Sequence, residues 1–342
     1  MGKYIPVYLL PLLNESCVRW YLGLASLLLT VPENNCSSKT NFMIAHDTNK
    51  GTAEKDPREK YPKPPYPKQE QDMPGLESKM DPRPDHGERS YKGSSKLKNM
   101  KAIITGGDSG IGKAVAIAFA REGADVLVSY LNEHEDARET EKYISDTGRK
   151  AILIPGDIQE EEHCRNIINT ALAEFGQIDI IVNNAAYQME HETLAEITAE
   201  EWDKTFRTNV CAMFYLCKAA EPYLKPGSSV INTTSVNAYK PKPILIPYTA
   251  TKAAIQNFTA SLAQLWADKG IRVNCVAPGP VWTPLIPGSF SADKVKEFGQ
   301  NAPIGRAAQP AEMAPAFVLL ASPEASYISG STLQATGGTP TI

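Results

Sequence analysis

A tyrosine and a lysine in the second half of the chain have the residue types and the spacing needed for proton transfer. Tyr248 and Lys252 lie four residues apart in YTATK, which leads into the helical pattern AAIQNFTASLAQLWAD. This spacing places both side chains on one face of a helix, within reach of one small molecule. Tyrosine has a reference pKa of about 10, and a neighbouring ammonium favours the phenolate. The pattern also occurs by chance on solvated helices, so the pair alone does not define a site.

Further candidates stand where predicted strands end. Ser235 ends SSVINTTS, Asn183 and Asn184 end IDIIVNN, and Asp157 follows ILIPG. Ligands of a doubly wound sheet bind at the carboxyl ends of its strands. We therefore expect Ser235 to hold a substrate oxygen opposite Tyr248.

The glycine-rich stretch TGGDSGIGKA, residues 105–114, lies between the apolar runs KAIIT and AVAIAFA. A glycine-rich turn between a strand and a helix leaves N–H groups free at the positive end of the helix dipole, which suits a phosphate. One interpretation is a triphosphate loop containing Lys113, but Ala114 stands where that loop needs a magnesium-binding hydroxyl. The other is a dinucleotide-binding turn, TGxxxGIG, from Thr105 to Gly112. The local pattern does not choose between them, and such turns also occur without a ligand.

The composition indicates a globular protein without a basic surface. Of the 342 residues 42% are hydrophobic, and the formal net charge is −4. Nucleic acid is not an expected partner, because a phosphate-binding surface needs a basic excess. The five histidines form no HExxH pattern, so no metal is expected. Six cysteines without a CxxC pair favour free thiols in a reducing compartment, the cytoplasm: Cys17, Cys36, Cys164, Cys211, Cys217 and Cys275.

Residues 1–46 read as an apolar N-terminal extension of low order. Two apolar runs, at 4–13 and 21–31, are broken by polar residues, and neither reaches the roughly 18 residues of a spanning helix. A signal peptide stays an alternative because Lys3 provides a basic start, but no small-residue cleavage site follows the second run. We expect no firm membrane association. Because the composition changes at Met43, we interpret this residue as a natural start.

Residues 47–98 form an arm rich in proline and in charges of both signs. Such a composition buries too little apolar surface to fold alone. Two interpretations remain open, a disordered tail and an extended segment laid across the domain or a neighbouring subunit. In the second, the anchoring side chains are Tyr61, Tyr66, Met73, Leu76 and Tyr91.

From residue 99 onward, short apolar strands alternate with longer helical stretches. The strands are KAIIT, DVLVSY, KAILIPGD, IDIIVNN, SSVINTTS and IRVNCVAPG, and the helices include KAVAIAFAREG, HEDARETEKYISDTG and CRNIINTALAEFG. This alternation predicts an α/β fold with a Rossmann-type doubly wound parallel sheet. We expect one dinucleotide-binding oxidoreductase domain over residues 99–342.

The chain from about residue 99 to 338 resembles the short-chain dehydrogenase/reductase family. The matching pieces are TGGDSGIG at 105–112, NNAA at 183–186, the asparagine of RTNV, Ser235, the YTATK pair, and PGPVWTP at 278–284. With QDMPGLESKMDP and YKGSSKL, the arm is similar to that of the bacterial glucose/ribitol-dehydrogenase-like subgroup.

The resemblance implies roles for individual residues. Tyr248 would be the general acid in reduction and the base in oxidation, Lys252 would lower its pKa and hold the nicotinamide ribose, and Ser235 would orient the carbonyl or alcohol. Asn209 would complete a proton relay through water. The implied cofactor contacts are Gly106, Ser109, Ile111 and Gly112 at the pyrophosphate, Asp157 and Ile158 at the adenine, Asn184 at the adjoining ribose, and Pro278, Gly279, Val281 and Thr283 at the nicotinamide end, besides Tyr248 and Lys252.

Cofactor choice depends on the end of the second strand. An acidic side chain there selects NAD by binding the ribose 2′-hydroxyl. Tyr130, Leu131 and Asn132 are neutral and favour NADP, whereas the nearby Glu133 argues for NAD. We expect NADP, with NAD as the alternative.

Polar residues beside the catalytic positions suggest a hydroxylated or small carbonyl substrate. Gln188, Asn237 and Tyr239 are candidate pocket residues, and residues 282–298 are a candidate mobile lid that excludes water. Alternatively, Gln188 and Asn237 satisfy only loop backbone. The expected substrate is a sugar, a polyol, or a small aldehyde or ketone.

Together these observations predict an NAD(P)-dependent oxidoreductase that transfers a hydride to or from a small alcohol or carbonyl compound. By resemblance we expect a homotetramer with contacts through residues 200–224 and 247–268. A catalytically silent dinucleotide-binding regulatory protein is the alternative, because a fold does not fix a function. A phosphotransferase is disfavoured by Ala114.

Overall fold

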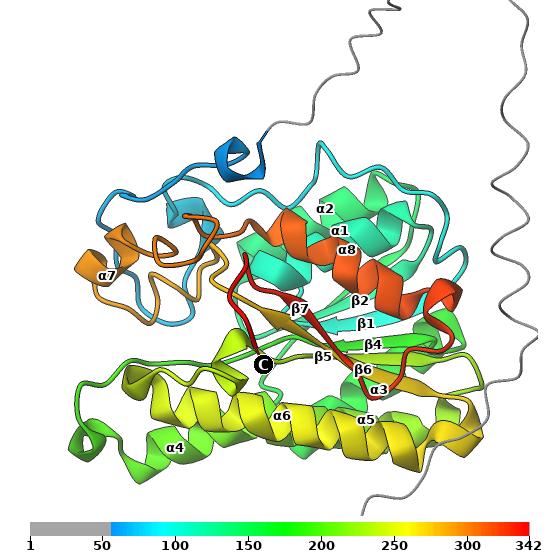
Figure 1. Cartoon of the computed structure of the whole chain (residues 1–342). Helices are drawn as coiled ribbons and strands as arrows, with labels where there is room; N and C mark the ends of the chain where they lie inside the picture. Colours follow the sequence, from blue (N-terminus) through cyan, green and yellow to red (C-terminus); the bar gives the residue numbers. More distant parts are fainter. Residues whose placement is uncertain (1–55, 342) are drawn as a thin grey trace, which may run out of the picture. The chain divides into compact units, whose positions relative to one another are not determined.

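The computed structural model describes residues 56–341, and these contain one seven-stranded parallel sheet in the order β3-β2-β1-β4-β5-β6-β7 (Figure 1). The order reverses between β1 and β4, which creates the switch point of a doubly wound sheet. The predicted Rossmann-type fold is therefore confirmed. The strands are Lys101–Thr105 (β1), Asp125–Tyr130 (β2), Ala151–Pro155 (β3), Ile180–Asn183 (β4), Ser229–Thr233 (β5), Arg272–Pro278 (β6) and Thr332–Ala335 (β7).

Helices cover both faces of the sheet (Figure 1). On one face lie Gly110–Arg121 (α1), His134–Ser145 (α2) and Pro310–Ala321 (α8), and on the other lie Glu161–Phe175 (α3), Ala199–Phe206 (α4), Ala212–Ala220 (α5) and Ile246–Leu265 (α6). A short helix, Ala292–Lys296 (α7), lies in the segment between β6 and α8. No helix in the described range 56–341 has the length and apolarity to cross a membrane.

The continuous apolar runs of the strands are explained by burial on both faces. Side chains alternate between the faces of a strand, so Ile103 packs with the layer of α3 and α5 while Ile104 packs with the layer of α1 and α8. Every residue of β2, β5 and β6 is buried. Because both faces of these strands are buried, their sequences are continuous apolar runs without alternating polar residues, and such runs predicted the strands correctly.

The seventh strand was not predicted. β7 contains only TLQA, and its residues are only partly buried because it is an edge strand paired with β6 alone. Helix α1 also begins at Gly110 instead of Lys113, so the glycine-rich turn already contains its first turn.

The described part of the arm, residues 56–98, belongs to the same compact unit as the sheet. Apart from two single turns, Pro57–Glu59 and Glu77–Lys79, the described arm contains no helix or strand. Tyr66 and Leu97 are buried, and among the predicted anchors Tyr91 donates its hydroxyl to Glu122 at 2.6 Å. The predictions for residues 1–46, including Met43, lie outside the described residues.

Candidate active site

Ser235, Tyr248 and Lys252 meet at the carboxyl ends of the strands, in one cavity of about 790 Å³. Ser235 follows β5 and accepts a hydrogen bond from the backbone N–H of Asn237 at 3.1 Å. Tyr248 and Lys252 lie in the first two turns of α6, on the face turned to β5. The four-residue spacing therefore has the predicted effect, because both side chains line the same cavity.

The cavity is lined by every predicted catalytic and cofactor residue except Asn209 and Gly112. Gly112 packs behind the turn, since a Cβ there would lie 1.9 Å from the carbonyl oxygen of Gly106. Gly106 itself has a φ of +61°, a conformation that glycine adopts without strain. Glycine at these positions is therefore needed for turn geometry and close packing.

Asn184 is partly committed to the same turn. Its Nδ2 donates to the carbonyl oxygens of Gly106 at 3.1 Å and Thr105 at 3.3 Å, and its Oδ1 accepts from Thr233 at 3.3 Å. The contact with an adjoining ribose stays a prediction. In the structure this side chain ties the glycine-rich turn to β5.

The charges of Tyr248 and Lys252 differ from the expectation. Burial raises the pKa of Tyr248 to about 12, opposed by a hydrogen bond with Ser235. Burial also lowers the pKa of Lys252 to about 7. The lysine Nζ donates to the carbonyl oxygen of Thr233 at 2.8 Å and lies 5.2 Å from the centroid of the tyrosine ring. Burial is therefore the largest influence on the pKa of both side chains in this structure.

Asn209 lies in a π-helical turn, Arg207–Cys211, between α4 and α5. Such insertions occur frequently at functional sites. Its Oδ1 accepts from the N–H of Tyr187 at 2.7 Å, and its Nδ2 donates to the Tyr187 carbonyl and to Thr251. The side chain thus joins the segment after β4 to α6, and its place in a proton relay stays a prediction.

The end of β2 lines the cavity with Tyr130, Leu131, Asn132 and Glu133. The carboxylate of Glu133 accepts a hydrogen bond from the backbone N–H of Asn132, with an N–O distance of 2.9 Å. Asp108 of the glycine-rich turn also lines this end, and burial, followed by the charge of Glu133, raises its pKa to about 8. Asp108 was not among the residues predicted from the sequence, although its place inside the turn was a usable signal.

The substrate end of the cavity contains Gln188 and Asn237, but not Tyr239. Gln188 donates its amide to Ser289 at 2.7 Å, so it joins the segment after β4 to the predicted lid. Asn237 reaches the cavity wall directly after Ser235.

Residues 282–290 of the predicted lid form a packed wall, whereas exposed side chains recur from Ser291 to Glu297. The mobility of the lid stays a prediction. Trp282 is fully buried, stacks on Tyr66 with 4.2 Å between ring centroids, and donates its indole N–H to the carbonyl of Pro82 at 2.7 Å. The arm supplies both partners, and the sequence contained no signal for this long-range packing.

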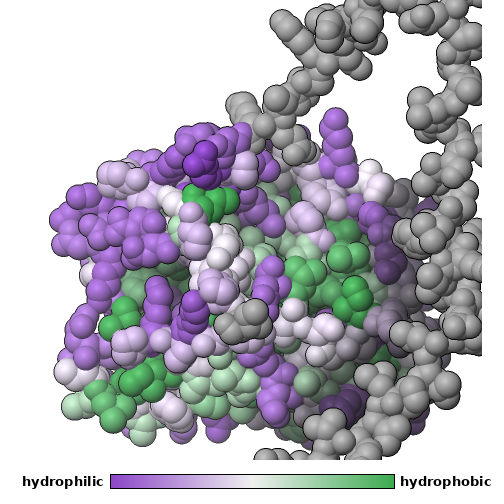
Figure 2. All heavy atoms as spheres, in the orientation of Figure 1, coloured by the Kyte–Doolittle hydropathy of each residue, from purple (hydrophilic) through white to green (hydrophobic). Residues whose placement is uncertain are grey.

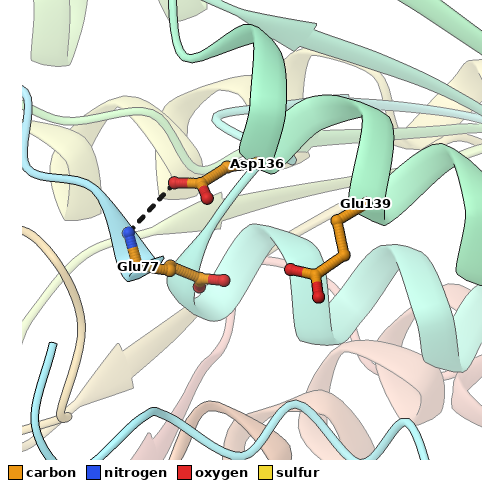
Figure 3. Close-up of side chains that lie close together, drawn as sticks. All are labelled: Glu77, Asp136 and Glu139. Atoms are coloured by element: carbon orange, nitrogen blue, oxygen red, sulfur yellow. Dashed lines mark hydrogen bonds between the residues drawn. The ribbon is translucent and has the colours of Figure 1, made fainter. Parts of the chain in front are cut away.

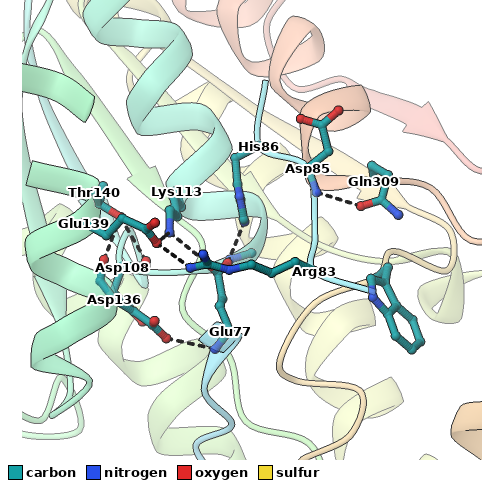
Figure 4. A network of polar contacts seen from close by, with 12 residues as sticks. Glu77, Arg83, Asp85, His86, Asp108, Lys113, Asp136, Glu139, Thr140 and Gln309 are labelled. Atoms are coloured by element: carbon teal, nitrogen blue, oxygen red, sulfur yellow. Dashed lines mark hydrogen bonds and ion pairs between the residues drawn. The ribbon is translucent and has the colours of Figure 1, made fainter. Parts of the chain in front are cut away.

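Lys113 does not serve a triphosphate loop. Figure 3 shows the carboxylates of Glu77, Asp136 and Glu139 close together, within 4.8 Å of one another. The buried ammonium of Lys113 donates to Glu77 at 2.7 Å and to Glu139 at 2.6 Å (Figure 4). Lys113 therefore compensates these carboxylates behind the turn, and it does not line the cavity.

Comparison with known proteins gives consistent matches. A family model described as enoyl-(acyl carrier protein) reductase matches residues 106–340. The uncharacterised oxidoreductase YhdF of Bacillus subtilis is 53% identical over 266 residues, 78% of this chain and 92% of that protein. The chloroplastic NADPH-dependent aldehyde reductase 1 of Arabidopsis thaliana is 46% identical, over 78% of this chain and 95% of that protein. Glucose and ribitol dehydrogenase of Daucus carota is 46% identical, over 79% and 94%.

A solved structure agrees with these relatives. The short-chain dehydrogenase of Burkholderia cenocepacia in complex with NADP superposes with a TM-score of 0.67 at 31% identity. The match covers 71% of this chain and 98% of that chain.

Proposed function

Because the chain belongs to the short-chain dehydrogenase/reductase family of NAD(P)-dependent oxidoreductases, we propose that its cavity transfers a hydride between NADP and a small alcohol or carbonyl substrate. The observation that carries the proposal is the convergence of Ser235, Tyr248 and Lys252 on the cavity that the glycine-rich turn also lines. The reported relatives are named as oxidoreductases, dehydrogenases or reductases, so a silent regulatory protein has no support among them.

Side chains of the protein transfer the proton and orient the substrate oxygen. During reduction Tyr248 donates its phenolic proton to the oxygen of the former carbonyl, and during oxidation it accepts the alcohol proton. Ser235 lines the same cavity as the tyrosine, so it is placed to share the same substrate oxygen. When bound, the nicotinamide would supply or accept the hydride, and its oxidised ring would carry a positive charge. A positive charge beside the phenol favours the phenolate and opposes the effect of burial.

NADP is the preferred cofactor of the proposal, and NAD the alternative. The carboxylate of Glu133 accepts a hydrogen bond from the backbone N–H of Asn132, and it lines the cavity together with the neutral Leu131 and Asn132. The Arabidopsis relative is named as NADPH-dependent, and the Burkholderia structure holds NADP. Dissociation constants for NADPH and NADH measured by nucleotide fluorescence test this preference, and a tighter constant for NADH would refute it.

The substrate of the proposal is a sugar, a polyol, or a small aldehyde or ketone. Gln188 and Asn237 provide polar groups beside the catalytic residues, and Ile286 and Phe290 provide an apolar wall. Such a mixed wall suits a molecule with a few hydroxyl groups on a short carbon chain. The carrot relative is named for glucose and ribitol, and the Arabidopsis relative for aldehydes.

We further propose a homotetramer located in the cytoplasm. Large apolar side chains are exposed on the layer of α4 to α6, including Trp202, Phe214 and Leu265. Figure 2 shows hydrophobic residues in green over this layer, in the lower part of the view. The four cysteines of residues 56–341 are free thiols, which suits a reducing compartment. Light scattering during size-exclusion chromatography tests the assembly, and a monomer would contradict it.

Replacement of Tyr248 by phenylalanine tests the proposed chemistry. We expect kcat to fall about 10³-fold with NADPH and the best aldehyde of a panel, because the proton donor is lost. NADPH binding is expected to stay within about threefold, since the ring remains. Tyr239→Phe, a tyrosine outside the cavity lining, is the matched control and is expected to keep full activity. A Tyr248→Phe enzyme with the wild-type kcat would refute the assignment.

A further inference from the structure

A glutamate of the arm reaches the start of the cofactor-binding helix. Glu77 is fully buried, and its Oε1 accepts a hydrogen bond from the backbone N–H of Gly110 at 2.7 Å. Its Oε2 accepts from the ammonium of Lys113 at 2.7 Å, and its own N–H donates to Asp136 at 3.0 Å. Figure 4 shows that the arm, α1 and α2 all contribute to this network. The arm is thus bonded to the turn through one side chain.

This contact lies behind the turn and not in the cavity. Gly110 is the first residue of α1, has a φ of +51° and lines the cavity, whereas Glu77 does not line it. The first N–H groups of a helix have no partner within the helix. Glu77 satisfies one of them from behind, which fixes the orientation of the peptide units that face the cavity.

The carboxylate of Glu77 is ionised. Burial alone would raise its pKa, but the neighbouring His86 and Lys113 hold it at about 2. The Nε2 atom of His86 lies 2.5 Å from Oε1, the same oxygen that accepts from Gly110. The hydrogen bonds to the two side-chain oxygens come from the N–H of Gly110 and the ammonium of Lys113, both of which are donors. A glutamine at this position has one acceptor end and one donor end, so it loses at least one of these bonds.

The arm also forms part of the cavity wall immediately before this glutamate. Met73, Pro74 and Gly75 line the cavity. Gly75 lies against the chain after β6, since a Cβ there would be 2.5 Å from the carbonyl oxygen of Pro284. Glu77 thus anchors an arm segment that itself lines the cavity.

We propose that Glu77 is a positioning residue for the dinucleotide: it holds the Gly106–Gly112 turn, through Gly110 and Lys113, in the conformation that binds the cofactor. The inference rests on the proposed function, because the cofactor is what this turn would bind. It predicts that loss of the glutamate weakens cofactor binding more than catalysis at saturating cofactor.

The chain offers a matched control at the other end of the same helix. Glu122 is also buried, and it holds the arm through the Tyr91 hydroxyl at 2.6 Å and the N–H groups of Ser94 and Lys96 at 2.8 and 2.9 Å. The twelve residues of α1 place it about 18 Å from the turn. Glu122→Gln therefore loosens the arm without touching the turn.

The test measures NADPH and ADP-ribose dissociation constants, melting temperatures without nucleotide, and steady-state kinetics for the full-length wild type, Glu77→Gln and Glu122→Gln. We expect Glu77→Gln to raise the dissociation constants of both ligands about tenfold, to raise the KM for NADPH by a similar factor, and to keep kcat within about twofold of the wild type. Glu122→Gln is expected to lower the melting temperature and keep wild-type dissociation constants. Equal dissociation constants for the two variants would overturn the proposal and leave Glu77 a purely structural residue. If the wild type itself bound neither nucleotide, the proposed function would fail instead.

A second variant covers the case in which Glu77→Gln does not fold. His86→Asn removes the group beside Oε1 and leaves the glutamate and Lys113 in place. We expect this variant to raise the dissociation constant for NADPH about threefold, in the same direction as Glu77→Gln. Unchanged NADPH binding in a folded His86→Asn protein would contradict the proposal.

Discussion

Replacing Lys252 with methionine should make the protein more stable and inactive. Burial lowers the pKa of this lysine from 10.5 to about 7, so folding disfavours its charged form. At about 1.4 kcal/mol for each pKa unit, the difference corresponds to about 5 kcal/mol of lost stability. Methionine also loses the hydrogen bond from Nζ to the carbonyl of Thr233, worth about 2 kcal/mol. The expected net gain is about 3 kcal/mol.

The sign of the effect depends on pH in a defined window. The cost of the buried ammonium is fully present below pH 7, where the folded lysine is protonated. It falls as the pH rises from about 7 to 10.5, because the folded lysine is then neutral and only the unfolded one keeps its charge. The advantage of Lys252→Met should therefore be largest below pH 7, should vanish at about pH 9, and should reverse above that pH because the lost hydrogen bond then outweighs the cost of burial.

The assay is urea unfolding of both proteins at pH 6, 8 and 9.5. Turnover of NADPH and an aldehyde is measured at each pH. Lys92→Met, a change at an exposed lysine of the arm, controls for the loss of a surface charge. Equal stability of Lys252→Met and the wild type at pH 6, or an advantage that does not shrink with pH, would refute the reasoning about burial. Full turnover by the variant would refute its assignment to the site.

Three further perturbations follow from the same structure. Burial raises the pKa of Asp108 to about 8, so its ionisation above that pH should weaken NADPH binding. Asp108→Asn should abolish this pH dependence in fluorescence titrations. A wild-type dissociation constant for NADPH that stays constant from pH 7 to 9 would contradict this prediction. Tyr66→Ala removes the ring stacked on Trp282, so it should lower the free energy of unfolding by about 3 kcal/mol and raise the substrate KM. The affinity for NADPH should stay unchanged and is the internal control. An unchanged KM would show that the cavity wall does not need the arm. Gly112→Ala places a Cβ 1.9 Å from the carbonyl oxygen of Gly106 and should eliminate NADPH binding in calorimetry, and tight binding by this variant would show that the turn can move.

The sheet and most of the site were predictable because their signals are local. Six strands were predicted to within two residues, since each is a short apolar run buried on both faces. The polar residues Ser235 and Asp157 were expected at one edge because parallel strands present their carboxyl ends together. The spacing of Tyr248 and Lys252 acts within one helix, so it too could be interpreted without tertiary structure.

The path of the arm could not be predicted, because its composition contains no periodic pattern. Its partners are far along the chain: Tyr66 packs on Trp282, and Glu77 bonds Gly110. Irregular segments without repeating hydrogen bonds take their conformation from the surface on which they pack. For the same reason the packing of Trp282 against the arm was not predicted.

The sequence by itself determined which residue types follow each strand and which pair shares a helical face, because periodicity and chain order fix those relations. Only the tertiary structure decided the lowered pKa of Lys252, the burial of Asp108 and the attachment of Glu77 behind the glycine-rich turn. These properties depend on how much water each group loses and on which distant donors surround it. Desolvation and long-range hydrogen bonding exist only after the chain has packed, so no local pattern contains them.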